Sequence, residues 1–87
     1  MVRQWQQLFH DRRYSFTELT NPNFQKIAEG YGIATNKVSE RTDLESAVDS
    51  WLNSDGPALL EVLVEKEENV FPMVPTGESV SNIRLEP

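Results

Sequence analysis

The chain has 87 residues, 38% hydrophobic and 25% charged, with a net charge of −6 and no cysteine. This length allows one small domain, and the lack of thiols excludes disulfides, thiolate zinc sites and iron–sulfur clusters. An acidic chain repels phosphate backbones, so we expect no nucleic-acid partner. No apolar run approaches the ~18 residues of a membrane span, so we expect no membrane partner and a cytoplasmic location.

The opening segment, residues 1–10, has the spacing of an amphipathic helix. Met1, Trp5, Leu8 and Phe9 follow one another at intervals of four, three and one, which places them on one helical face. The polar residues between them occupy the rest of the surface. The next five residues break the pattern, so we expect a loop there.

A second helix is predicted after Asn21. Asn21 suits an N-cap, and Pro22 suits the first helical position because its missing N–H is not needed there. Gly32 suits a left-handed helix stop. The apolar residues between them recur at helical spacing and are Phe24, Ile27, Ala28 and Tyr31.

Two strands and a third helix follow. Residues 32–39 alternate weakly as in a strand, and residues 58–65 form an apolar run typical of a strand buried on both faces. Between them, Thr42 and Glu45 predict a capping box. The helix behind that box places one apolar face, Trp51 included, toward the core: Leu44, Ala47, Val48, Trp51 and Leu52.

The predicted order is therefore helix, helix, strand, helix, strand. A single helix between two strands makes a right-handed crossover, so the strands are expected to be parallel. Because two strands leave both edges of a sheet open, we interpret the chain as the C-terminal portion of a doubly wound parallel sheet of the α/β class. A compact two-layer α/β mini-domain is the alternative. From residue 66 onward we expect an irregular C-terminal tail whose apolar residues 70–74 pack on another part of the protein.

Six short motifs, in the same order along the chain, resemble the catalytic large subunit of acetolactate synthase (acetohydroxyacid synthase). They are residues 1–6 (MVRQWQ), 13–15 (RYS), 21–24 (NPNF), 28–32 (AEGYG), 56–62 (GPALLEV) and 70–74 (VFPMV). The resemblance implies that residues 1–77 are the C-terminal fragment of a thiamine-diphosphate-binding domain and that residues 78–87 are a C-terminal tail.

The resemblance also implies a function. Acetolactate synthase condenses pyruvate, after its decarboxylation, with a second 2-oxo acid, either pyruvate or 2-oxobutanoate, in branched-chain amino-acid synthesis. The intact enzyme uses thiamine diphosphate, Mg²⁺ and FAD, and forms a homodimer or higher oligomer with a regulatory small subunit. The family's Gly-Asp-Gly diphosphate motif does not occur in residues 1–87. We therefore expect this chain alone to bind none of these cofactors, to be inactive, and to need the remainder of the catalytic subunit.

Four residues acquire expected roles from the resemblance. Met1 matches a methionine against the cofactor, Val2 matches a position lining the active-site channel, and Trp5 matches the tryptophan that favours 2-oxobutanoate over pyruvate. Phe9 lies one helical turn beyond Trp5 on the same face, so we expect it to border that channel. An indole can gain from contact with one extra methylene, an effect of roughly 1–3 kcal/mol. We expect no catalytic residue and no metal ligand in this chain, and His10 is interpreted as an exposed helix end.

Two other readings are compatible with the same residues. The apolar strand GPALLEV occurs more widely among thiamine-diphosphate enzymes, so the chain could be a fragment of another carboligase or decarboxylase of that class. It could also be a free-standing, non-catalytic α/β interaction module. The products formed by an intact parent enzyme would separate these readings.

Overall fold

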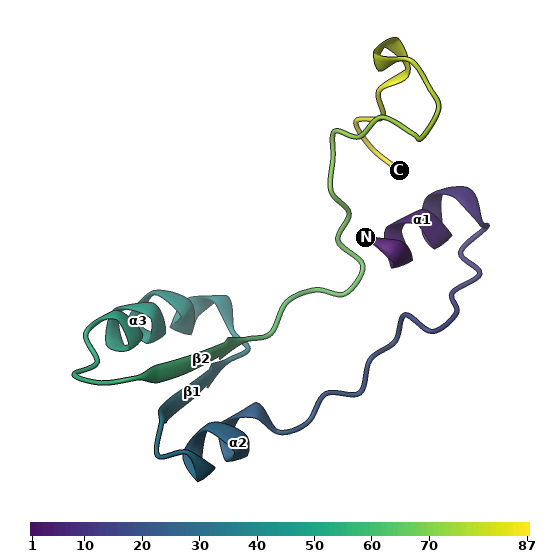
Figure 1. The fold of residues 1–87 in the computed structure, drawn as a ribbon. Helices are drawn as coiled ribbons and strands as arrows, with labels where there is room; N and C mark the ends of the chain where they lie inside the picture. Colours follow the sequence, from purple (N-terminus) through teal and green to yellow (C-terminus); the bar gives the residue numbers. More distant parts are fainter. The chain divides into compact units, whose positions relative to one another are not determined.

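The structure is a computed structural model that describes residues 1–87. Along the chain the elements are α1 (Val2–Phe9), α2 (Phe24–Gly30), β1 (Ala34–Val38), α3 (Arg41–Leu52), β2 (Ala58–Val62) and a short 3-10 helix, η1 (Val80–Asn82) (Figure 1). They form two compact units. Unit 1 consists of residues 1–19 and 65–87, and unit 2 of residues 20–64.

Unit 2 is a small parallel α/β arrangement. Strands β1 and β2 pair in parallel, from Ala34 opposite Ala58 to Val38 opposite Val62. Both α2 and α3 contact both strands, and they lie on opposite sides of the sheet (Figure 1). The α/β class and the parallel pairing predicted from the sequence are confirmed.

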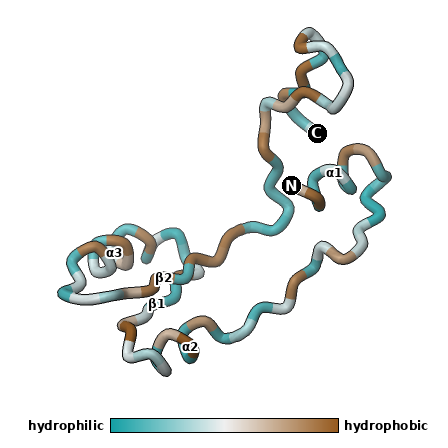
Figure 2. The backbone as a smooth tube through the Cα atoms, viewed as in Figure 1, coloured by the Kyte–Doolittle hydropathy of each residue, from teal (hydrophilic) through white to brown (hydrophobic).

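The core of unit 2 is small. Its buried hydrophobic residues are Ala28 from α2, Val38 from β1 and Ala47 from α3, each 3–6% exposed. Strand β2 is only half-buried, so the expectation of a strand covered on both faces is wrong for this chain. The reason is geometric, because β2 has one neighbouring strand and two short helices above and below it. The apolar run also continues past the end of β2, where the tube stays brown (Figure 2). Val64, in this continuation, is 83% exposed.

Helix α2 begins two residues later than predicted. Asn23, not Asn21, is the N-cap, and its side-chain oxygen accepts a hydrogen bond from the Lys26 backbone N–H at 2.9 Å. The stop is as expected, since Gly32 has a φ of +72°, a conformation that glycine adopts at little cost. Asn23 directly precedes the first helical residue, so its side chain reaches the N–H of the third helical residue, Lys26, as an N-cap does.

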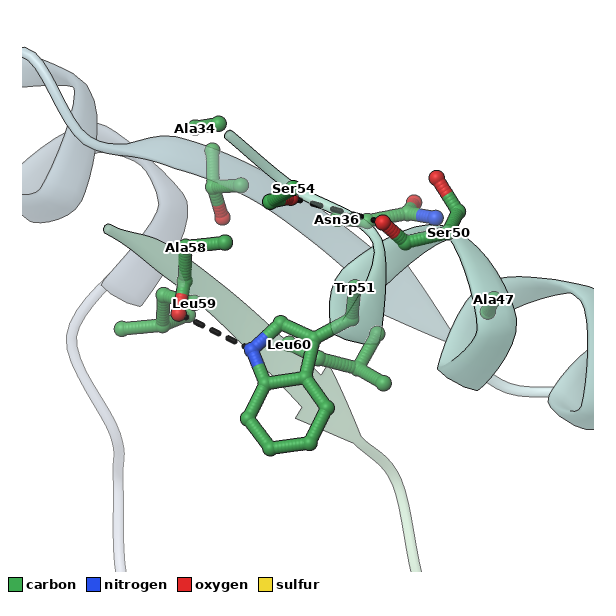
Figure 3. A pocket seen from close by; sticks show the side chains of 10 residues that line it. Ala34, Asn36, Ala47, Ser50, Trp51, Ser54, Ala58, Leu59 and Leu60 are labelled. Carbon is green, nitrogen blue, oxygen red and sulfur yellow. Dashed lines mark hydrogen bonds between the residues drawn. The ribbon is translucent and has the colours of Figure 1, made fainter. Parts of the chain in front are cut away.

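Helix α3 also starts differently from the prediction. Its N-cap is Glu40, and no side chain caps it, so Thr42 and Glu45 lie within the first turns and form no capping box. The prediction that Trp51 is a core residue is also wrong, because its side chain is 44% exposed. The Trp51 indole instead lies along the start of β2, where Nε1 donates to the Ala58 carbonyl at 2.9 Å (Figure 3).

Unit 1 joins α1 to the irregular tail. The tail has no regular element except η1, plus one antiparallel bridge in which Met73 and Arg84 exchange backbone hydrogen bonds of 3.0 and 2.8 Å. Its contact with α1 runs through polar side chains of the helix. The Arg3 guanidinium donates to the Glu68 carbonyl and to Asn69 Oδ1. The predicted irregular tail is therefore confirmed, and within unit 1 it packs on α1.

None of the helices has both the length and the apolar character that crossing a membrane would require.

Candidate functional site

The predicted site residues all lie on or next to α1. The helix follows Met1 as its N-cap and runs to Phe9, without a side-chain cap at its start. Val2, Trp5 and Phe9 are spaced by three and four residues, so they share one side of the helix. That side is open to solvent: Trp5 is 46% exposed and Phe9 is 40% exposed. Half-exposed aromatic rings on one helix side form a surface suited to an apolar ligand.

A groove of about 380 Å³ lies between α1 and the tail of unit 1. One wall consists of Trp5, Phe9 and His10 at the C-terminal half of the helix. The other wall comes from the tail: Met73, Pro75, Thr76 and Glu78. A volume of this size is enough for a small organic ligand. Its lining of two aromatic rings and a thioether favours the apolar part of such a ligand.

A second, more open hollow of about 480 Å³ adjoins the same helix. It is lined by Val2, Trp5, Gln6, His10 and Arg13. Trp5 and His10 therefore border both hollows; the lining of the first also includes Glu78, and that of the second Arg13. The Trp5 indole is the side chain of α1 best placed to contact a ligand in either hollow.

A cation lies beside the groove. The guanidinium carbon of Arg84 is 5.1 Å from the centre of the Phe9 ring, within the range of a cation–π contact. Arg84 forms no ion pair with a carboxylate in the structure, since the ion pairs are Lys37–Glu61 and Lys66–Glu18. The positive charge near Phe9 comes from the same tail residue that pairs with Met73.

The structure thus brings Val2, Trp5 and Phe9 together on one helix side, while Met1 is 63% exposed at the helix start. His10 is exposed at the helix end, as interpreted from the sequence. Met73 lines the groove, and Pro72, beside it in the chain, does not. The roles assigned to these residues by resemblance remain predictions.

Sequence reasoning missed Gln4. Its side chain is 2% exposed and is the one buried polar side chain of the chain. The signal was available in the helical spacing, because Gln4 precedes Leu8 by one turn and so borders the apolar face. The free-energy cost of burying a polar side chain at that position is offset only if the side chain forms hydrogen bonds. Those partners lie 66 to 69 residues away, where no local pattern points to them.

Unit 2 carries a smaller hollow, of about 80 Å³, between α3 and the sheet (Figure 3). Its walls are alanine and leucine side chains and the Trp51 ring, and its polar members are Thr35, Asn36, Ser50 and Ser54. That volume holds a few waters at most. We therefore place the candidate site in unit 1.

Unit 1 thus carries a groove large enough for a small organic ligand, and unit 2 is a parallel α/β arrangement. Comparison with known proteins gives the family. Residues 1–62 match the family model "Thiamine pyrophosphate enzyme, C-terminal TPP binding domain". This chain belongs to that family.

The names of individual relatives are more specific than the description of the family. The chain is 50% identical over 84 residues, 95% of its length, to the acetolactate synthase isozyme 2 large subunit of Escherichia coli K12. It is 46% identical over 85 residues to the mitochondrial acetolactate synthase of Schizosaccharomyces pombe, and 46% over 81 residues to the acetolactate synthase large subunit of Porphyra purpurea. The matches cover 98% and 91% of this chain. The chain spans only 13–15% of the length of these relatives.

The residues of this chain do not by themselves fit the diphosphate and metal part of a thiamine diphosphate site. No three His, Asp or Glu side chains lie close enough together to hold a metal ion. Helix α3 has Glu40 as its N-cap and Asp43 in its first turn, and these carboxylates oppose an anion at that helix end.

Proposed function

We propose that this chain works as the C-terminal part of an acetolactate synthase catalytic subunit. The observation that supports this most strongly is the 50% identity over 95% of the chain to a large subunit of that enzyme. The reaction proposed for the complete subunit is the condensation of pyruvate, after decarboxylation, with pyruvate or 2-oxobutanoate. It belongs to branched-chain amino-acid synthesis. Residues 1–77 are proposed as the domain fragment and residues 78–87 as the tail.

Within that reaction we assign α1 to the substrate pocket. Trp5 faces the second 2-oxo acid, with Val2 and Phe9 beside it and Met1 against the cofactor. The support is that Trp5 is a half-exposed aromatic residue that borders both hollows of unit 1. An ethyl group is one methylene longer than a methyl group, and a rigid indole gains contact with it at little entropic cost.

The cofactors and partners of the complete subunit are part of the same proposal. We expect thiamine diphosphate, Mg²⁺ and FAD to be held by other parts of the subunit, and this chain alone to be inactive. The name "large subunit" among the relatives supports a regulatory small subunit as partner, beside a homodimer or higher oligomer. The cytoplasmic location also remains a prediction, and one of the relatives carries a mitochondrial name.

A segment exchange tests the proposal. The aligned part of the Escherichia coli large subunit is replaced by this chain, and acetolactate and 2-aceto-2-hydroxybutanoate are quantified from mixtures of the two 2-oxo acids. We expect both products to form. Trp5→Leu in the hybrid should lower the preference for 2-oxobutanoate by roughly tenfold or more, while acetolactate formation continues.

Trp51→Leu is the matched control, because Trp51 is 44% exposed, close to the 46% of Trp5, but lies in unit 2. It should leave the product ratio unchanged. A hybrid that folds but forms neither product would contradict the acetolactate synthase assignment. It would favour another thiamine-diphosphate carboligase or decarboxylase, or a non-catalytic module. A ratio that falls equally in both variants would make Trp5 a structural residue.

A further inference from the structure

The contact between α1 and the tail is concentrated in one side chain, Gln4. Its Oε1 accepts from the Val70 backbone N–H at 2.7 Å, and its Nε2 donates to the Val70 carbonyl at 3.0 Å. The same Nε2 donates to Met73 Sδ at 2.9 Å. The amide of Gln4 therefore pairs with the Val70 backbone as a neighbouring strand would, and it also fixes the next side chain along the groove.

The bonds of this clamp are partly shielded from water. Gln4 is 2% exposed, whereas Val70 is 61% exposed. A hydrogen bond that is shielded from solvent holds its partners more firmly than an exposed one, since water does not compete for the same atoms. Arg3, one residue earlier, adds hydrogen bonds to Glu68 and Asn69 but none beyond residue 69. Position 73 therefore depends on Gln4 and on the bridge to Arg84.

Met73 is the link from the clamp to the candidate site. It lines the groove opposite Trp5 and Phe9, and both its side chain and its backbone are held, by Gln4 and Arg84 respectively. Movement of the tail away from α1 widens the groove on the side that faces the indole. A wider groove loses contact with the last carbon of a ligand before it loses contact with the rest.

We propose that Gln4 is a positioning residue for substrate choice: its amide clamps Val70 and Met73 to α1 and so sets the width of the groove beside Trp5. This inference rests on the proposed function, because the ligand it discriminates is the second 2-oxo acid. Gln4 touches no reacting atom. It acts through Met73.

Two measurements on the same hybrid subunit test the proposal, with Gln4→Met as the variant, since methionine keeps the length of the side chain but lacks the amide. The first measurement is hydrogen exchange in peptides covering residues 66–74. The Val70 amide should be protected in the parent hybrid and should exchange at least about tenfold faster in the variant, because its one hydrogen-bond acceptor is Gln4 Oε1. Gln6→Met is the control, because Gln6 bonds only to Ser15 and Thr17 and makes no hydrogen bond to residues 66–74.

The second measurement is kinetic. Gln4→Met should raise KM for 2-oxobutanoate as the second substrate and lower the preference for it by roughly threefold to tenfold, less than Trp5→Leu because the effect is indirect. The kcat for acetolactate from pyruvate alone should change by less than about twofold, since no reacting atom is touched. When Met73→Ala is already present, adding Gln4→Met should not change the ratio of the two products further. The reason is that the effects of two coupled residues are not additive.

An unprotected Val70 amide in the parent hybrid, or one that stays protected in Gln4→Met, overturns the clamp. Faster exchange with an unchanged product ratio overturns the role in substrate choice. Equal loss of kcat for both products shows a purely structural role and overturns it as well. A folded hybrid that makes neither product removes the proposed function and with it the substrate role, while the exchange experiment still decides on the clamp.

Discussion

Units 1 and 2 satisfy their backbone hydrogen-bonding groups in different ways. In unit 2 the backbone pairs with itself, through the parallel strands β1 and β2 and the helices beside them. In unit 1 side-chain amides take the place of a second strand: Gln4 bonds to both backbone groups of Val70, and Gln6 does the same for Ser15. A backbone ladder survives most side-chain changes, whereas a side-chain clamp disappears with one substitution. We therefore expect single side-chain substitutions to disrupt the structure of unit 1 readily. Unit 2 should tolerate them except at its small core.

The largest effect is expected at that core. Val38→Asp places a carboxylate where the side chain is 5% exposed, with no partner to compensate it. We expect a loss of about 3 kcal/mol or more in the free energy of unfolding, enough to unfold unit 2 of a domain this small. Thermal unfolding followed by circular dichroism measures it. Val64→Asp, at a position 83% exposed, is the control and should change little; equal effects would mean that Val38 is not a core residue.

The second prediction concerns the start of α2. Asn23→Ala removes the side-chain oxygen that caps the Lys26 N–H and should cost about 1 kcal/mol. Asn21→Ala, two residues earlier, should cost less than about 0.5 kcal/mol, as surface substitutions usually do. Urea unfolding of both variants compares them directly. A larger loss at Asn21 would restore the cap predicted from the sequence and contradict the observed one.

The third prediction tests the weaker clamp of unit 1. Gln6 bonds to Ser15 in both directions and accepts from the Thr17 hydroxyl at 3.2 Å, but the two bonds to Ser15 are exposed to solvent. Gln6→Met should cost about 0.5–1 kcal/mol, because water can replace most of what is lost. Faster hydrogen exchange of the amides of residues 13–17 would measure this loss of stability. Exchange there that does not change would show that the loop holds its shape without Gln6.

The smallest effect is a gain in unit 2. The Thr35 hydroxyl in β1 is buried without a hydrogen-bond partner. Thr35→Val keeps the shape, removes the unpaired polar atom and should stabilise the chain by roughly 0.5 kcal/mol. The same change at Thr17 removes its bond to Gln6 and should have the opposite sign. Melting temperatures of the two variants that move in the same direction would contradict this assignment of paired and unpaired hydroxyls.

Local patterns in the sequence predicted the three α-helices and two strands, but neither the first residues of α2 and α3 nor η1. The apolar spacing of residues 1–10 predicts α1, and Gly32 ends α2 with the left-handed backbone expected of it. The apolar run after Pro57 predicts β2, and the single helix between two strands predicts their parallel pairing. Each of these depends on residues that are neighbours in the chain, so the physical cause is contained in a short window. The family followed from short motifs for the same reason.

Tertiary structure decided the features that depend on distant contacts. Trp51 lies on a regular apolar helix face, yet it is half-exposed because a two-stranded sheet is too narrow to cover it. Val70, 66 residues from Gln4, supplies the backbone groups that bury that amide, and no spacing rule connects the two. The groove beside Trp5 likewise exists only because Met73 and Pro75 are brought to α1. Residue types and helical periods determine which elements form; burial and the shape of the site require knowing which distant residues those elements meet.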